Sequence, residues 1–277
     1  MGGILHIAPG AADETNGIAV AAKLIARAQG ASVVDAADVT RRQVDVADEV
    51  WVHSMWLPSV RRACRGVLRA GKPLVRVPHG CLDPLRLKYH GWKKWWFNSL
   101  ERGLFRRAAR VVATCAAEAG WIRAYEPRVR EVEVLDLHRF FVVSAAHPKG
   151  DGAVRNVHFL YLGRRHPLKG VDYLEPAMQG LRHAELRIVS GAVGEEKERA
   201  WAWCDVLVLP TLSENFGVVV AEALQRGKRV ITTDGAPAWA DVPGIVYLRG
   251  FVVAEPHERI RLLHEAIAAE CRGFAAV

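Results

Sequence analysis

The sequence predicts an α/β protein with two doubly wound, Rossmann-like domains facing a cleft. Short apolar runs alternate with stretches of helical spacing, and the alternation restarts after residues 144–156, which are rich in small residues, proline and glycine. Alternating strands and helices of this kind form parallel sheets covered by helices. The length of 277 residues is also large for one domain and ordinary for two.

The first domain, residues 1–150, contains apolar runs that we expect to be strands and stretches with the spacing of amphipathic helices. The expected strands are 4–8, 50–54, 73–77, 111–114 and 132–137. The expected helices are 18–28, 57–70, 92–109 and 116–125. Gly30 and Gly71 support two of the helix ends, because glycine commonly terminates a helix.

The second domain, residues 151–277, repeats the pattern. Its expected strands are 157–162, 186–190, 206–210 and 230–233, and its expected helices are 170–181, 195–204 and 218–227. A last helix at 256–271 closes the chain, and we expect it to pack back on the first domain. Ligands of such sheets bind where the strands end, so the loops after the strands are the candidate sites.

The composition is that of a soluble protein, with 51% hydrophobic and 25% charged residues. No apolar run approaches the roughly 20 residues that span a bilayer. The opening residues MGGILHIAPG lack the basic segment of a signal peptide, so we expect a cytoplasmic protein. The five cysteines are scattered and no His/Cys cluster has ligand spacing, so we expect reduced thiols and no metal site.

Charge is unevenly distributed along the chain. Residues 1–150 carry a net charge of +9 and residues 151–277 a net charge of −1, and 86–110 holds eight basic residues and one acid. The basic residues of 86–110 are interleaved with aromatics. This pattern fits an anionic membrane surface or a phosphorylated acceptor, but it also fits an amphipathic helix with its aromatics in the core. Without a nucleic-acid fold signature, we expect no nucleic-acid partner.

A loop and helix start at 209–225 carries the strongest chemical signal. "TLSENFG" follows an expected strand, so the amides of Asn215, Phe216 and Gly217 can hold a phosphate at the start of the next helix. Glu222, inside that helix, can accept hydrogen bonds from a ribose, and Glu214 can bind hydroxyls of the group beyond the phosphates. The alternative is that Glu214 is a helix-start acid and Glu222 a solvated surface residue.

Two cations follow the first strand of the second domain. In "GRRHPLKG", Arg164 and Lys169 lie at the same sheet edge as the loop above and can neutralise a diphosphate leaving group. The alternative is a solvated basic loop. In the first domain, His79 ends a strand and can donate to a hydroxyl or phosphate, or shuttle a proton. It can equally be a structural histidine that caps a turn.

The tandem of "GRRHPLKG" and "SENFGVVVAEALQRGKRVITTDGAP" resembles the retaining nucleotide-sugar glycosyltransferases of family 4, which have the GT-B fold. The branch most similar builds lipopolysaccharide cores and exopolysaccharides. The resemblance implies that Arg164 and Lys169 contact the donor diphosphate. It also implies that Glu214 contacts the donor sugar and that Glu222 holds the ribose.

The first domain resembles the acceptor domains of that branch more loosely, through "VPHGCLDP" and the Lys/Trp-rich segment after it. Gly17, in "DETNGIAV", stands where the family has a glycine loop facing the diphosphate. The implied enzyme needs no cofactor or metal. It moves a hexose from a nucleotide sugar to a glycan or lipid-linked acceptor, on the cytoplasmic side and peripheral to the membrane.

Two departures from the family pattern leave alternatives open. The segment "LDLHRFF" replaces the usual Asn-Gly after the last strand of the first domain, and residues 186–204 are about one strand-helix unit shorter than the pattern. A non-catalytic nucleotide- or glycan-binding relative, or a sugar-nucleotide epimerase on the same fold, therefore remain as alternatives.

Overall fold

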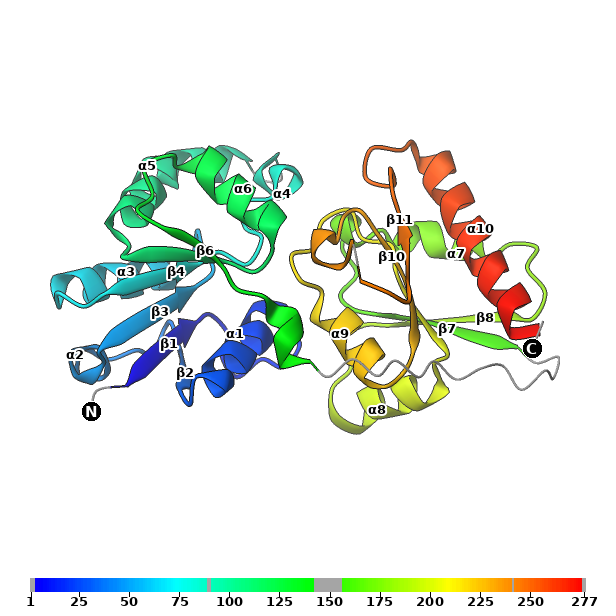
Figure 1. Cartoon of the computed structure of the whole chain (residues 1–277), viewed down its shortest axis with the longest axis horizontal. Coiled ribbons are helices and arrows are strands. Elements are labelled where there is room, and N and C mark those ends of the chain that lie inside the picture. The colour runs from blue at the N-terminus through cyan, green and yellow to red at the C-terminus, as the bar shows by residue number, and fades with distance from the viewer. Residues whose placement is uncertain (1–2, 89–90, 142–155, 241, 276–277) are drawn as a thin grey trace. The chain divides into compact units, whose positions relative to one another are not determined.

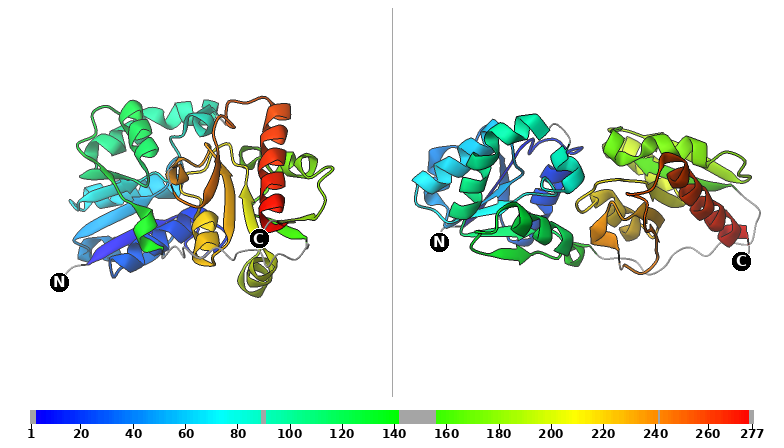
Figure 2. Two further views of the ribbon diagram at one scale, coloured as in Figure 1. Left: turned by 45° about the vertical axis from the view of Figure 1, so that its right-hand side comes forward. Right: turned by 90° about the horizontal axis from the view of Figure 1, so that it is seen from above.

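The structure, a computed structural model, describes residues 3–88, 91–141, 156–240 and 242–275. It divides into two compact units, Met1–Phe140 and Phe141–Val277 (Figure 1). The boundary predicted at residue 150 lies outside the described residues. Each unit is a parallel sheet covered by helices, as the sequence predicts, and Figure 2 shows helices on both sides of each sheet.

The first unit has a six-stranded parallel sheet in the order β2-β1-β3-β4-β5-β6. Its strands are β1 (Ile4–Ala8), β2 (Ser32–Asp35), β3 (Glu49–His53), β4 (Leu74–Val77), β5 (Arg110–Ala113) and β6 (Val132–Val134). Its helices are α1 (Gly17–Ala28), α2 (Arg41–Val46), α3 (Pro58–Arg69), α4 (Pro84–Lys88), α5 (Gly91–Arg107), α6 (Ala116–Tyr125) and the 3-10 turn η1 (Leu137–Phe140).

The two faces of the first sheet bury different side chains. Right-handed crossovers place α1 on one face and α2, α3, α5 and α6 on the other. The main hydrophobic core lies on the second face, where Leu5 and Ile7 of β1 pack with residues of α3, α5 and α6. Side chains alternate along a strand, so His6, between Leu5 and Ile7, points to the α1 face.

The second unit has a five-stranded parallel sheet in the order β11-β10-β9-β7-β8. Its strands are β7 (Val157–Leu162), β8 (Ala184–Val189), β9 (Val206–Leu209), β10 (Arg229–Thr233) and β11 (Ile245–Leu248). Its helices are α7 (Leu174–Ala177), α8 (Gly194–Trp203), α9 (Val218–Gln225) and α10 (Pro256–Ala275), with 3-10 turns η2 (Pro167–Lys169), η3 (Val171–Tyr173) and η4 (Pro237–Trp239). In Figure 1, α8 and α9 cover one face of this sheet, and α7 and α10 cover the other.

The last helix packs within the second unit as far as its contacts are described. We expected α10 against the first domain; its described contacts are with α7, η3, β7 and β11. Leu263, Ile267 and Phe274 are buried along one side of α10. Their spacing is that of an amphipathic helix covering a core.

Most predicted elements are present, and one is not. Strand β7 and helix α6 have the predicted bounds. The helix predicted at 170–181 is instead the short turn η3 followed by the four-residue α7. Pro176 explains the difference, because it has no N–H to donate and cannot continue a helix that starts at residue 170. The prediction missed β2, β11, α4 and α2, although α2 begins with a capping box between Thr40 and Gln43.

A buried ion pair ties α5 to the first sheet. Arg76 of β4 and Glu101 of α5 are both 0% exposed, and Nη2 of Arg76 lies 3.2 Å from Oε2 of Glu101. The same guanidinium donates to the carbonyl of Ser54 at 3.1 Å and to Sγ of Cys64 at 2.6 Å. Glu101 is the single acid of the basic segment 86–110, so it is an internal partner for Arg76 and not part of the charged surface.

The side chains of the segment 86–110, which was predicted to face a membrane, are described only in part. The side chains of 91–96, which include Lys93 and Lys94, lie outside the described residues. Arg106 lies 3.8 Å from Glu126, and Arg110 lies 3.0 Å from Glu49. In the part of the chain that is described, no helix is both long and apolar enough to cross a membrane.

Glu101→Gln should lower the free energy of unfolding by about 3 kcal/mol, because it leaves the Arg76 cation buried without its counter-charge. The double variant Arg76→Met/Glu101→Leu removes both charges and should recover most of that loss. Urea denaturation of the three proteins measures both effects. A loss below about 1 kcal/mol for Glu101→Gln would show that Arg76 does not depend on this carboxylate.

Candidate functional site

The carboxyl ends of β7, β9 and β10 meet at one edge of the second sheet, and their loops form the candidate site. Residues 163–170 follow β7, 210–217 follow β9, and 234–236 follow β10. Backbone hydrogen bonds join the first two loops, because the carbonyl of Leu168 accepts from the amides of Leu212 at 2.8 Å and Ser213 at 3.3 Å. The hydroxyl of Thr211 also donates to this carbonyl at 3.1 Å.

Two glycines permit these loops to pack closely. Gly170 has a left-handed φ of 63°, and a Cβ on it would lie 1.9 Å from the carbonyl oxygen of Pro210. A Cβ on Gly235 would lie 2.1 Å from the carbonyl oxygen of Thr211. The Thr233 hydroxyl donates to the same Thr211 carbonyl. Only glycine fits such backbone contacts, so the sequence itself sets the separation of the three loops.

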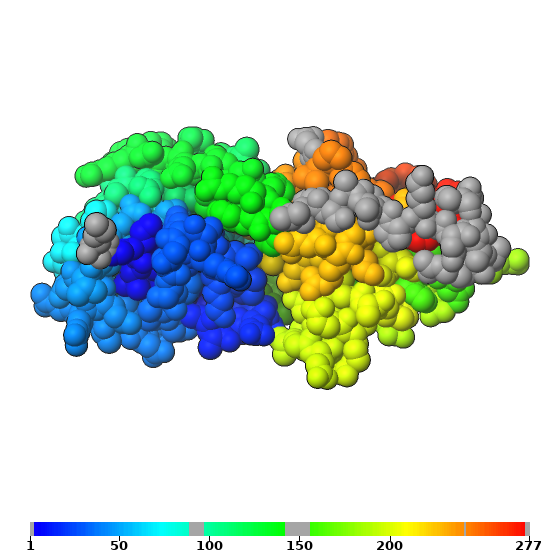
Figure 3. All heavy atoms as spheres, turned by 60° about the horizontal axis from the view of Figure 1, so that its bottom comes forward, coloured from blue at the N-terminus to red at the C-terminus, as the bar shows by residue number. Residues whose placement is uncertain are grey.

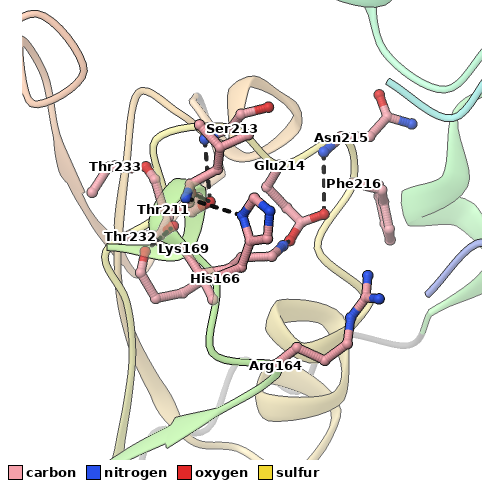
Figure 4. Close-up of polar contacts among 12 residues, drawn as sticks. Arg164, His166, Lys169, Thr211, Ser213, Glu214, Asn215, Phe216, Thr232 and Thr233 are labelled. Carbon is pink, nitrogen blue, oxygen red and sulfur yellow. Dashed lines mark hydrogen bonds and ion pairs between the residues drawn. The ribbon is translucent and has the colours of Figure 1, made fainter. Parts of the chain in front are cut away.

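Lys169 and Glu214 form an ion pair at the centre of this edge. Figure 4 shows the Lys169 ammonium, from the β7 loop, meeting the Glu214 carboxylate, from the β9 loop. Both side chains are mostly buried, at 16% and 17% exposure. The amide of Glu214 donates to the carbonyl of Gly235 at 2.7 Å, which fixes its backbone against the β10 loop. Two residues predicted to touch different parts of a donor are therefore in contact with each other.

Helix α9 begins directly beside this pair. Gly217 is its N-cap with φ of 69°, and a Cβ there would lie 3.2 Å from Cγ of Glu214. The amide of Asn215 donates to Oε1 of Glu214 at 3.2 Å. The Phe216 ring is 3% exposed and packs between Phe141 and Trp239, with ring centroids 5.6 and 5.0 Å away. The carboxylate thus folds back over the helix start that was predicted to bind phosphate.

Glu222 is held by a lysine from the neighbouring helix. Nζ of Lys197, in α8, lies 2.7 Å from Oε1 of Glu222, in α9, and the Glu222 side chain is 18% exposed. A second pair, Arg226 with Glu198 at 2.7 Å, joins the same two helices. The alternative of a solvated surface residue does not describe Glu222. Figure 3 shows α8 at the surface of the second unit.

Arg164 is the most accessible of the predicted donor-binding residues in the second unit. It follows the end of β7, and its side chain is exposed, while its carbonyl accepts from the Tyr161 hydroxyl at 2.8 Å. In Figure 4 its side chain extends away from the backbone separately from the Lys169–Glu214 pair. The residues brought together at this edge are therefore Lys169, Glu214 and the start of α9, with Arg164 on an adjoining loop.

Gly17 and His79 belong to the first unit. Gly17 is the first residue of α1, where Asn16 caps the helix by accepting from the amide of Ile18 at 3.1 Å. It is exposed, and a Cβ there would meet nothing within 4 Å. Gly17 is therefore not required by packing.

His79 is the end of a buried row of three histidines on the α1 face of the first sheet. His6, His53 and His79 are 0%, 0% and 4% exposed. Nδ1 of His6 lies 2.9 Å from Nε2 of His53, and Nδ1 of His53 lies 2.8 Å from Nε2 of His79. At the other end, Nε2 of His6 lies 2.8 Å from Oε1 of Gln29, the C-cap of α1.

The row fixes the tautomer of His79. Because Oε1 of Gln29 can only accept, Nε2 of His6 carries the proton and its Nδ1 accepts from His53. The same logic makes His53 accept from Nε2–H of His79, which leaves Nδ1 of His79 unprotonated. The turn beside it is fixed by the buried Glu118, which accepts from the amide of Gly80 at 2.5 Å.

The histidines of the row are neutral near pH 7. Burial lowers the pKa of His79 to about 3 and that of His6 to about 4. Burial, followed by the proximity of His79, holds the pKa of His53 well below its ordinary value. A proton shuttle near neutral pH, one of the roles predicted for His79, needs an imidazolium that this burial disfavours. The other predicted role, hydrogen bonding, is compatible with a neutral His79.

Sequence reasoning missed Gln29, His6, His53, Glu118 and Lys197. Each acts through a partner that lies 23 to 47 positions away, as with His6–Gln29 and His6–His53, apart from the local bond of Glu118 with Thr114. One available signal was that His53 and His79 each end or directly follow a strand, at neighbouring positions of one sheet. Among the described residues, no group of three or more His, Cys, Asp or Glu side chains is arranged to hold a metal ion.

Gly170→Ala should strongly destabilise the second unit. A left-handed φ costs a non-glycine residue roughly 1–2 kcal/mol, and the clash with the Pro210 carbonyl adds to this cost. Gly17→Ala is the matched control and should change the free energy of unfolding by less than about 0.5 kcal/mol. Urea denaturation compares the two. Equal stabilities for both variants would contradict the close packing of the β7 and β9 loops.

The buried histidines should make stability depend on pH. The unfolded chain binds protons as the pH falls below about 6.5, whereas the folded row does not until the pH is much lower. Each buried histidine should therefore lower the free energy of unfolding by about 1 kcal/mol between pH 7.5 and pH 5.5. This stability should return as the pH is raised again. His6→Asn should make this dependence shallower. A free energy of unfolding that is constant over this range would contradict the burial of the row.

Comparison with known proteins identifies both units. A family model described as "Glycosyl transferase 4-like domain" matches residues 9–138. A second model, described as "Glycosyl transferases group 1", matches residues 141–269. No curated protein matches the sequence.

Solved structures match almost the whole chain at low identity. HepE of Anabaena, solved with UDP and glucose, is 15% identical, with 100% of this chain and 94% of that chain covered and a TM-score of 0.67. Sucrose-phosphate synthase of Thermosynechococcus elongatus is 14% identical, with 99% and 100% covered and a TM-score of 0.62. Trehalose 6-phosphate synthase of Burkholderia multivorans is 9% identical, with 100% and 94% covered and a TM-score of 0.61. The chain therefore consists of a glycosyl transferase 4-like domain followed by a glycosyl transferases group 1 domain, and it shares the GT-B fold of the solved structures.

Proposed function

We propose that the protein transfers a hexose from a nucleotide-diphosphate sugar to a glycan or lipid-linked acceptor in lipopolysaccharide or polysaccharide biosynthesis, with retention of the anomeric configuration. The observation that carries the proposal is the Lys169–Glu214 pair at the start of α9, within the group 1 domain. The binding of UDP-glucose by HepE, which shares this fold, supports a uridine nucleotide as the first donor to test.

The donor would exchange partners with the ion pair. In the reaction the bond from the anomeric carbon to the diphosphate oxygen breaks, and the diphosphate leaves with an additional negative charge. Lys169, Arg164 and the amides of Asn215, Phe216 and Gly217 would stabilise that charge. As Lys169 turns to the diphosphate, the Glu214 carboxylate becomes available to the hydroxyls of the sugar.

Glu222 and the first-unit residues would complete the site. Lys197 holds the Glu222 carboxylate through Oε1, so a ribose would be bound by an already oriented acceptor. His79 would contribute its unprotonated Nδ1 as an acceptor for a sugar hydroxyl, and Gly17 would allow the donor diphosphate to approach the start of α1. The acceptor hydroxyl would attack the anomeric carbon as its bond to the diphosphate breaks, and its proton would pass to the departing diphosphate oxygen.

We propose that catalysis needs neither metal nor cofactor, since Lys169, Arg164 and the start of α9 supply the positive charge for the diphosphate. We also propose a cytoplasmic protein, peripheral to the inner face of the membrane through residues 86–110. The net charge of +9 on residues 1–150 supports an anionic surface or acceptor for this half.

A panel of nucleotide sugars tests the function through the release of nucleoside diphosphate, with chelator present. Lys169→Ala should weaken nucleoside-diphosphate binding by roughly 10- to 100-fold, because a charge-assisted contact is lost. Arg182→Ala, an exposed arginine just before β8 and so at the opposite sheet edge, is the matched control. Binding of a nucleotide without release of diphosphate from any donor would favour the non-catalytic alternative, and unchanged affinity in Lys169→Ala would reject the phosphate site.

The two glutamates should separate turnover from affinity. Glu214→Gln should reduce turnover more than nucleotide affinity, because its proposed partner is the sugar. Glu222→Gln should reduce nucleotide affinity more than turnover, because its proposed partner is the ribose. Calorimetry with the nucleoside diphosphate and steady-state kinetics with the donor distinguish the two. The opposite pattern, or no effect in either variant, would contradict the assigned roles.

A further inference from the structure

A pocket rich in arginine lies between α3 and α5 of the first unit, outside the residues assigned to the donor. It has a volume of about 380 Å³, and its lining includes Phe97, Leu100 and four arginines of α3, namely Arg61, Arg62, Arg65 and Arg69. Helix α3 contains no acidic residue. Arg62 and Arg69 also line a second hollow of about 310 Å³ on the α2 side of α3.

Arg61 is the unusual member of this set. It is only 8% exposed, and its guanidinium carbon lies 3.8 Å from the centre of the Phe97 ring. Its Nη1 is buried, and no hydrogen-bond partner for it is found among the described residues. A buried N–H without an acceptor costs free energy, and such groups are rare in folded proteins. Arg61 also lines the pocket, so its charge would attract an anionic acceptor that enters from outside the chain.

The other three arginines extend the same charge to the surface. Arg62, Arg65 and Arg69 are exposed and spaced three and four positions apart, so they share one face of α3. The described ion pairs include no carboxylate partner for any of the four. Like charges at these spacings repel each other, and an anion bound between them would relieve that repulsion. Their shared face therefore has the character of an anion-binding surface around the buried Arg61.

We propose that this pocket binds a phosphate ester. Guanidinium groups make paired, charge-assisted hydrogen bonds to phosphate, and several together suit a doubly charged group. Phe97 and Leu100 are 40% and 45% exposed and offer an apolar surface beside the cations. The phosphate can belong to a soluble ester or to a lipid headgroup. The site lies in the first unit and does not depend on the proposed donor chemistry of the second.

The test compares Arg62→Gln/Arg65→Gln/Arg69→Gln with the wild type. Calorimetric titration with glycerol 1-phosphate probes a soluble ester, and co-sedimentation with phosphatidylcholine vesicles, with and without phosphatidylglycerol, probes a headgroup. Wild type should bind one of these probes, and the triple variant should bind it about tenfold or more weakly. Binding of the ester indicates a soluble ligand, whereas binding only to vesicles that contain phosphatidylglycerol indicates a headgroup.

Two further variants make the result specific. Arg27→Gln/Arg123→Gln/Arg130→Gln removes the same charge from exposed arginines elsewhere in the first unit and should bind like wild type. Arg61→Lys keeps the charge but loses the planar donor, and it should weaken binding several-fold with an unchanged unfolding temperature. Equal losses in both triple variants, or no binding of either probe by wild type, would overturn the proposal. Neither readout needs turnover, so failure of the donor proposal would be seen separately.

Discussion

The contact between Gly170 and the carbonyl of Pro210 sets the geometry of the candidate site. It lets the loop after β7 lie directly on the loop after β9, where Leu168 accepts hydrogen bonds from Thr211, Leu212 and Ser213. Lys169 immediately precedes Gly170, and Glu214 is four residues beyond Pro210. The two side chains can meet only because the backbones beneath them are this close. The charge arrangement thus follows from the absence of a single Cβ.

Each proposed donor-binding carboxylate is already paired with a lysine. Glu214 pairs with Lys169 and Glu222 with Lys197, and these side chains are between 16% and 26% exposed. These charges are mostly buried, and a buried charge without a partner would cost free energy, so the pairing stabilises them. The pairs differ in what a ligand would do. A diphosphate would compete with Glu214 for Lys169, whereas Lys197 occupies only Oε1 of Glu222 and leaves the buried Oε2 without a described hydrogen-bond partner.

Sequence reasoning succeeded where the signal is local. Strand β7 is an apolar run interrupted only by His158, and α6 is a short stretch of helix-forming residues between two strands. Both have their predicted bounds. The predicted helix at 170–181 failed because apolar spacing outweighed the effect of Pro176. Lys169 and Glu214 were identified as residues of one edge, but their contact was not. It depends on how closely two loops pack, which residue spacing does not encode.

The charge asymmetry of the chain has a more specific structural basis than the sequence indicates. The sequence directs attention to 86–110, but there Glu101 neutralises Arg76 inside the core, and Arg106 and Arg110 have acidic neighbours. In the sequence, four arginines over nine residues of α3 resemble an ordinary solvated helix face. The burial of Arg61 distinguishes α3 from a solvated face. A solvated face does not place one arginine at 8% exposure, with its guanidinium against an aromatic ring and one nitrogen buried without a described hydrogen-bond partner. Among the described residues of the first unit, α3 therefore gathers four arginines around one pocket, without described ion-pair partners.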